Sequence, residues 1–292
     1  MPLDALHPVA GNHAIQTAAF VVEWATPLDT QVLRAVRGLA EKLRSSFPIV
    51  QEHQIATVQI DLRKPHHSPI KGLKGKPGPG SHRQGGHASE LGAVLFASAS
   101  ALPTGQVGRT LQVNRDNCVV VVNDYTRWDT VWPQVVNWLG VVLPTVLAGR
   151  AMTAFTLQFH DVFNWKDDPA LLDLREVFAP NCPYLPPNCY DLRTLWHSHH
   201  GFMEQVVEPA QGTVLDNVNI NVQDVGGSQR QISAMLTHRM GYGNLVWGTG
   251  AIPAIEAAAP WLHARNKARL NLLLSDAVKR MIGLNGNQGG VQ

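Results

Sequence analysis

The sequence predicts an α+β fold with antiparallel sheets, arranged as two related halves that are each flanked by helices. Three observations predict this class. Segments rich in β-branched and aromatic residues follow one another with only short turns between them, which is typical of antiparallel strands. Amphipathic helical patterns are present, but they do not alternate with every strand. The chain closes with one long helical pattern over residues 254–283.

The first half is expected over residues 12–165. Its elements are, in order, a strand at 14–24, a helix at 26–48, a strand at 54–62, strands at 92–100 and 109–124, a helix at 128–149 and a strand at 151–165. Asp29 or Thr30 is a suitable N-cap for the first helix, which Pro48 ends. A mobile basic loop is expected at 63–89, because glycine, proline, lysine and histidine crowd it and no apolar periodicity survives there.

The second half is expected over residues 170–284, followed by a flexible tail at 285–292. Its elements are a short helix at 169–178, strands at 194–209, 213–225 and 230–240, and the long C-terminal helix. The Gly226–Gly227 pair predicts a hairpin turn. Pro260 predicts a break in the long helix, because proline lacks the N–H that a helix interior needs.

The composition limits the classes of function. The chain has 292 residues, of which 45% are hydrophobic and 16% charged, and its net charge of +2 does not by itself indicate nucleic acid or a membrane surface. It contains no run of 18 apolar residues, and its first residues do not resemble a secretory signal. Three sparse cysteines, Cys118, Cys182 and Cys189, predict free thiols in a cytoplasmic protein. No cofactor is expected.

The most conspicuous polar stretch is Thr194–Val207, "TLWHSHHGFMEQVV". On a strand, His197 and His199 share one face about 7 Å apart, while His200 points the other way. Two imidazoles could begin a zinc or nickel site, but such a site needs three or four ligands and no carboxylate or cysteine follows closely. We therefore interpret these histidines as a polar strand face, with a His-based metal-dependent enzyme as an alternative.

A second polar pair lies in "QFHDVF", residues 158–163. Phe155, Leu157 and Phe159 alternate with Thr156, Gln158 and His160, so Gln158 and His160 are expected on a polar strand face. His160 and Asp161 are adjacent and must face opposite ways, which excludes a preformed His–carboxylate pair. The sequence also lacks the H-E-x-x-H, G-x-S-x-G and P-loop patterns. We identify no catalytic, cofactor-binding or metal-ligating residue.

The basic loop is the strongest sequence feature that points to a function rather than to a structural role. Residues 63–87 contain six Lys or Arg residues and no acid. The six are Arg63, Lys64, Lys71, Lys74, Lys76 and Arg83. A flexible cationic segment can contact phosphate groups without sequence preference, although this one lacks the aromatic residues typical of single-strand binders. A solvated insertion is the other interpretation, and the contact to anions or nucleic acid stays a hypothesis.

Several segments resemble a sporadically distributed family of uncharacterised prokaryotic proteins. They are "FP" at 47–48, "LQVNRD" at 111–116, "YTRWDTVWPQV" at 125–135, "FTLQFHDVF" at 155–163 and "WLHARNKARLNLLLSDAVKRMIG" at 261–283. The loop at 63–87 looks like an insertion, and Gln158 and His160 stand where relatives carry arginine and polar residues. The resemblance implies no established activity. The family's patchy distribution suggests accessory genes, including stress and phage-defence loci.

These observations together favour a cytoplasmic, non-enzymatic protein that acts through a protein partner. The alternatives are nucleic-acid binding through residues 63–87 and the histidine-based enzyme.

Overall fold

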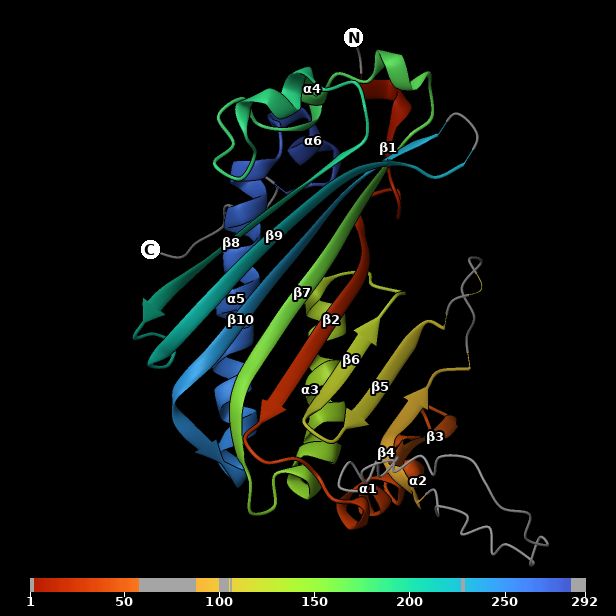
Figure 1. Ribbon diagram of the computed structural model, residues 1–292, viewed down its shortest axis with the longest axis vertical. Coiled ribbons are helices and arrows are strands. Elements are labelled where there is room, and N and C mark those ends of the chain that lie inside the picture. The colour runs from red at the N-terminus through yellow and green to blue at the C-terminus, as the bar shows by residue number, and fades with distance from the viewer. Residues whose placement is uncertain (1–2, 58–87, 100–104, 106, 227–228, 285–292) are drawn as a thin grey trace, which may run out of the picture.

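The computed structural model describes residues 3–57, 88–99, 105, 107–226 and 229–284. Ten strands form one antiparallel sheet in the order β3-β4-β5-β6-β2-β7-β10-β9-β8, and β1 pairs with β7 off this path (Figure 1). The strands are β1 (Leu6–Pro8), β2 (Ile15–Trp24), β3 (Ile49–Thr57), β4 (Ala88–Ala97), β5 (Arg109–Asn114), β6 (Asn117–Val122), β7 (Ala151–Trp165), β8 (Trp196–Val206), β9 (Gly212–Asp224) and β10 (Arg230–Trp247).

The helices flank this sheet. They are α1 (Thr30–Arg37), α2 (Ala40–Leu43), α3 (Trp128–Val146), α4 (Leu174–Val177), α5 (Ala251–Leu273) and α6 (Asp276–Met281), with 3₁₀ turns η1 (Leu3–Ala5), η2 (Pro169–Leu171), η3 (Pro187–Asp191) and η4 (Gly248–Gly250). Mixed helices, a large antiparallel sheet and a long helix near the C-terminus agree with the predicted α+β class.

The strands of the two expected halves belong to one sheet rather than to separate sheets. β2 pairs with β7, with Ala18 opposite Phe159, and β7 pairs on its other edge with β10, with Phe159 opposite Leu236. β7 therefore lies in the interior of the sheet, between β2 and β10. Periodicity identifies a strand and its inward face, but pairing is a long-range contact that it does not record.

Two helix predictions differ from the structure. Asp29 caps α1, accepting a hydrogen bond from the N–H of Val32 at 2.9 Å, but the helix ends at Gly38 and α2 follows as a separate turn. The N–H of Leu39 bonds back to the carbonyl of Val36, a tightening that ends regular α-helix. Pro260 lies inside α5 without ending it. The break comes at 274–275, where Ser275 caps α6.

The buried core lies between the sheet and its helices and divides into two clusters. The larger surrounds α3 and includes Phe155 and Phe159 of β7, whereas the smaller lies beside α4 and α6 and includes Phe163. The clusters therefore part along β7, between Phe159 and Phe163. The residue at that point on the inward face is Asp161.

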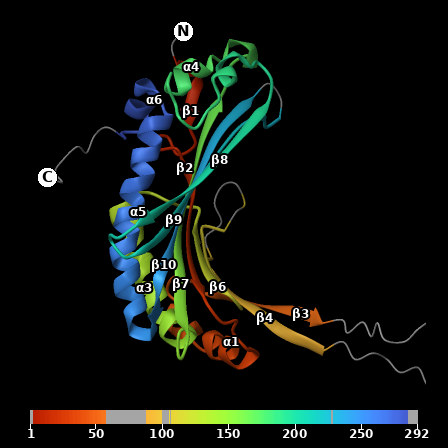
Figure 2. The ribbon, with the colours of Figure 1, turned by 60° about the vertical axis from the view of Figure 1, so that its left-hand side comes forward.

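The opposite face of the sheet is polar. Figure 2 shows α3 and α5 together on one side, and no described helix crosses the other side. Amide side chains cover much of that open face, and the ion pair between Arg239 and Glu23 crosses it at 2.7 Å. The half-buried amides are Gln158, Asn217, Asn219, Asn221 and Gln231. A face of this kind is normal for an antiparallel sheet that is solvated on one side.

Candidate functional site

The four polar strand residues that the sequence singled out lie on the open face but do not converge. His160 of β7 lies opposite Met235, Met235 lies opposite Asn219, and Asn219 lies opposite His199 of β8. Three strand spacings, about 14 Å in all, therefore separate the two histidines. Gln158 and His197 lie on the same face, in the two rows of paired residues that flank the row of His160 and His199. Burial lowers the pKa of His160 below its ordinary value.

Other predicted contacts fall elsewhere. Arg63, Lys64, Lys71, Lys74, Lys76 and Arg83 lie outside the described residues. His200 points to the helix side of the sheet, where its ring contacts those of Tyr184 and Phe202. Within the part of the chain that the structure describes, no three His, Cys, Asp or Glu side chains lie close enough to hold a metal ion. No described helix is long and apolar enough to span a membrane.

A cavity of about 340 Å³ lies where the two core clusters part. Four segments that are distant in sequence enclose it: the residues before β2, the start of α3, the middle of β7, and α5 with the end of α6. Its main lining residues are His13, Tyr125, Trp128, Phe159, Asp161, His263, Asn266 and Leu270, with Arg127, Asp129 and Lys267 among those exposed to solvent. Cavities of this kind commonly form at the junction between packed units.

Asp161 is the most unusual group in this cavity. Its side chain is only 2% exposed, and its Oδ2 atom has no hydrogen-bond partner. Among the ion pairs of the described residues, none includes Asp161. Burial raises the pKa of this carboxyl to about 7. A buried polar atom without a partner carries a desolvation cost, so a group that enters the cavity and donates a hydrogen bond to Asp161 is stabilised.

Aromatic rings form the walls around this carboxyl. The ring of His263 stacks on that of Trp128 with centroids 4.1 Å apart, and Trp128 in turn stacks on Trp132 at 5.2 Å. Tyr125 meets the ring of Phe159 edge-on at 5.7 Å. Burial, aided by the charge of Lys267, lowers the pKa of His263 to about 3, so its imidazole is neutral near pH 7.

A charged network lies behind the cavity. Asn266 lines the cavity, and its Oδ1 atom lies 3.1 Å from Nε2 of His238. Nδ1 of His238 lies 2.6 Å from Oδ1 of Asp216. Arg265 also donates a hydrogen bond to this Oδ1, and Arg269 donates one to Oδ2 of the same carboxylate. Burial alone would raise the pKa of Asp216, but the bonds from His238 and Arg265 outweigh it and hold that pKa well below its ordinary range.

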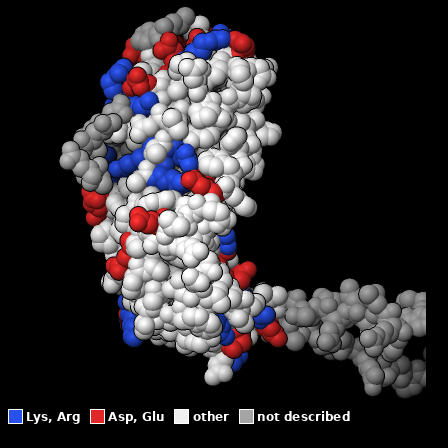
Figure 3. All heavy atoms as spheres, turned by 90° about the vertical axis from the view of Figure 1, so that its left-hand side faces the viewer, with Lys and Arg blue, Asp and Glu red and all other residues white. Residues whose placement is uncertain are grey.

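This network ties β9 and β10 to α5 and fixes the amide of Asn266 at the cavity wall. Figure 3 shows Lys and Arg side chains gathered at mid-height on one side of the molecule, next to acidic ones. Arg265 pairs with both Asp216 and the more exposed Glu204. Asp216 therefore has two arginine partners from α5, in contrast to Asp161.

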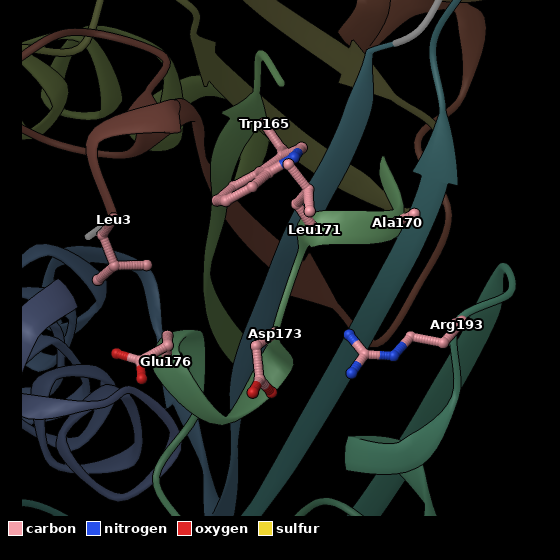
Figure 4. Close-up of a pocket in the computed structure, with 7 residues that line it drawn as sticks. All are labelled: Leu3, Trp165, Ala170, Leu171, Asp173, Glu176 and Arg193. Carbon is pink, nitrogen blue, oxygen red and sulfur yellow. The ribbon is translucent and has the colours of Figure 1, made fainter. Parts of the chain in front are cut away.

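A second cavity of about 180 Å³ is a weaker candidate. Figure 4 shows its lining side chains, which come from the first described residues, the end of β7, and the segments around α4 and before β8. Three of its four polar side chains have partners within the protein, and the fourth, Glu176, is exposed to solvent. Arg193 donates to the carbonyl of Leu172, the indole N–H of Trp165 donates to the carbonyl of Asp168, and Asp173 caps α4. It offers no unpartnered group comparable to Asp161.

Sequence reasoning missed Asp161, Asp216 and His238 as a group, although a signal was present. Each occupies an inward position in a strand of alternating residues: Asp161 follows Phe159, Asp216 follows Val214, and His238 follows Leu236 at a spacing of two. A charged residue in the buried register of a strand is rare unless it has a partner or a function.

Comparison with known proteins found no match among protein-family models, curated proteins or solved structures. The resemblance drawn from the sequence segments therefore remains a hypothesis.

Proposed function

We propose that this protein binds a small molecule in the cavity around Asp161, and that its role is binding rather than catalysis. The observation that carries the proposal is the carboxyl of Asp161, which faces the cavity without a hydrogen-bond partner for Oδ2. The aromatic walls and the amide of Asn266 support it, because small-molecule sites combine apolar surface with a few oriented polar groups.

On this proposal the ligand-bound protein acts through a protein partner in the cytoplasm, which is the kind of partner that the sequence leads us to expect. The cavity is enclosed by segments of both halves, including β7 and α5. A ligand there contacts both core clusters and can change how they pack against each other. Such a change in packing is how ligand binding would alter the surface that the partner contacts.

We also propose that the two halves are related. Here the second half begins with β7, which the expected bounds of 12–165 place in the first half. Each half then contributes a strand, a meander whose last strand returns beside the first, and a long helix: β2 to β6 with α3, and β7 to β10 with α5. On this proposal the cavity lies beside the junction of two similar units. Separate expression of the halves is no test, because β2 and β7 pair across them.

The test of the binding function is a fragment screen by amide NMR on isotope-labelled protein. We expect fragments that shift the signals of Tyr125–Asp129 and His263–Leu270 together, since both segments line the cavity. Leu284→Trp, which fills the cavity edge, should abolish these shifts. Leu272→Trp, an equal change at an exposed position of α5, should leave them intact. If fragments shift only other regions, or none at all, the binding function is wrong.

A further inference from the structure

The charged groups around Asp161 define what its ligand must supply. Asp161 comes from β7 and His13 from the segment before β2. Tyr125 and Arg127 precede α3, and Asp129 lies in its first turn. α5 contributes His263 and Lys267, and the residues after α6 contribute only Ile282, Gly283 and Leu284. Arg127 and Lys267 are exposed, and neither forms an ion pair with Asp161. The buried carboxyl therefore has no cation from the described residues.

The aromatic walls of the cavity narrow the class of possible ligands further. Four rings, those of Tyr125, Trp128, Phe159 and His263, contribute to the lining. Flat aromatic ligands pack well against such walls, and a ring that carries positive charge gains additional attraction from aromatic faces. A carboxylate has two oxygens in one plane, so it binds best to two adjacent N–H donors held in a plane.

We infer that the cavity binds a flat aromatic cation whose amidine-like edge donates two N–H groups to the carboxylate of Asp161. This inference rests on the proposed binding function and names its ligand class. The class comprises amidines, guanidines and protonated 2-amino N-heterocycles. A neutral amide of the same shape offers a single donor side and no charge, and an aromatic carboxylate would instead favour Arg127 and Lys267.

The ionisation of Asp161 gives this ligand class a distinct pH profile. The pKa of Asp161 is raised to about 7 by burial, so the carboxylate form grows from a minority at pH 6 to the majority at pH 8. Benzamidine stays cationic over that range. Its affinity should therefore rise about tenfold from pH 6 to pH 8. Tyr125 keeps its proton throughout because burial raises its pKa, and His263 stays neutral.

The experiment is calorimetric titration of the full-length protein with benzamidine, benzamide and benzoate at pH 6 and pH 8. We expect benzamidine to bind at least about tenfold more tightly than benzamide at pH 8, because charge-assisted bonds are the stronger ones. Asp161→Asn should remove both that preference and most of the pH dependence. Glu256→Gln, which removes an exposed acid of α5 outside the cavity lining, should change neither by more than about threefold.

Three results would overturn the inference: tighter binding of benzoate than of benzamidine, equal binding of benzamide, or an unchanged pH profile in Asp161→Asn. Absence of benzamidine binding while NMR fragments still occupy the cavity would refute the ligand class and leave the binding function standing. Amide NMR spectra of both variants establish that they are folded, so loss of binding cannot be confused with unfolding.

Discussion

Oδ1 of Asp216 lies 2.6 Å from Nδ1 of His238, and neither side chain has any exposed surface. Arg265 and Arg269 reach the same carboxylate from α5 at 2.8–3.0 Å. One buried anion thus holds two strands and a helix together. Because its partners are themselves charged or polar, removal of the anion leaves several of them without compensation.

The substitution Asp216→Asn should strongly destabilise the protein. It keeps the shape of the side chain but removes the charge that the two arginines face. We expect the free energy of unfolding to fall by about 3–5 kcal/mol, the usual cost of breaking a buried charged pair. Urea unfolding followed by circular dichroism measures it.

Asp224→Asn is the matched control, since Asp224 ends the same strand and pairs with Arg230 at 3.0 Å but is 47% exposed. It should cost less than about 1 kcal/mol. Equal losses for the two variants would show that burial of the Asp216 network contributes nothing special.

Asp161 should make the protein less stable as pH rises. Its folded-state pKa of about 7 lies above the ordinary value for aspartate, so between about pH 4 and pH 7 the folded state holds a proton that the unfolded state has lost. The free energy of unfolding therefore falls through this window and levels off above it. Asp161→Asn lacks the titration, and its stability advantage over the parent should grow by about 2–3 kcal/mol between pH 5 and pH 8.

Urea unfolding of both proteins at the two pH values measures this difference. Glu256→Gln again serves as the control and should show no such growth. Asp216 does not interfere, because its depressed pKa affects stability only as pH falls below the ordinary aspartate range. A constant difference between parent and Asp161→Asn would mean that Asp161 is not titrating in this window.

Gly212 at the start of β9 should not tolerate a side chain. A Cβ atom there would lie 2.1 Å from the carbonyl oxygen of Gly241 in β10, so the backbone of one strand would have to move. We expect Gly212→Ala to lower the free energy of unfolding by about 1–3 kcal/mol, as overpacking typically does. Gly201→Ala in β8, where the nearest atom would be 3.7 Å away, should be close to neutral. Thermal unfolding of the pair compares them, and similar melting temperatures would contradict this packing.

The three cysteines should resist thiol reagents in the folded protein. Cys118, Cys182 and Cys189 are all free, as the sequence led us to expect, and all three are buried. Burial raises the pKa of Cys118 to about 12. A thiol reacts as its thiolate, so labelling with Ellman's reagent should be slow until urea is added, when all three react. Fast labelling of the native protein, or a Cys182–Cys189 disulfide, would contradict the prediction.

Local patterns in the sequence predicted most of the strands and helices and the face that each one buries. Alternation in β7 predicted that His160 and Asp161 point apart, and the structure has Asp161 buried and His160 half-buried on the open face. Asp29, one of the two expected N-caps of the first helix, does cap α1. These properties depend on neighbours one to four positions away, which any stretch of sequence records.

Which strands and helices contact one another was not predictable from these local patterns. β7 pairs with β2 on one edge and with β10 on the other, which joins the strands of both expected halves into one sheet. The cavity likewise needs His13, Tyr125, Asp161 and His263 to come together from four segments. Likewise, Asp216 and His238 each appear in sequence as an isolated charge on an apolar face, and α5 supplies the partners. Contacts of this kind depend on strand order and helix placement across the whole chain, so no local pattern encodes them.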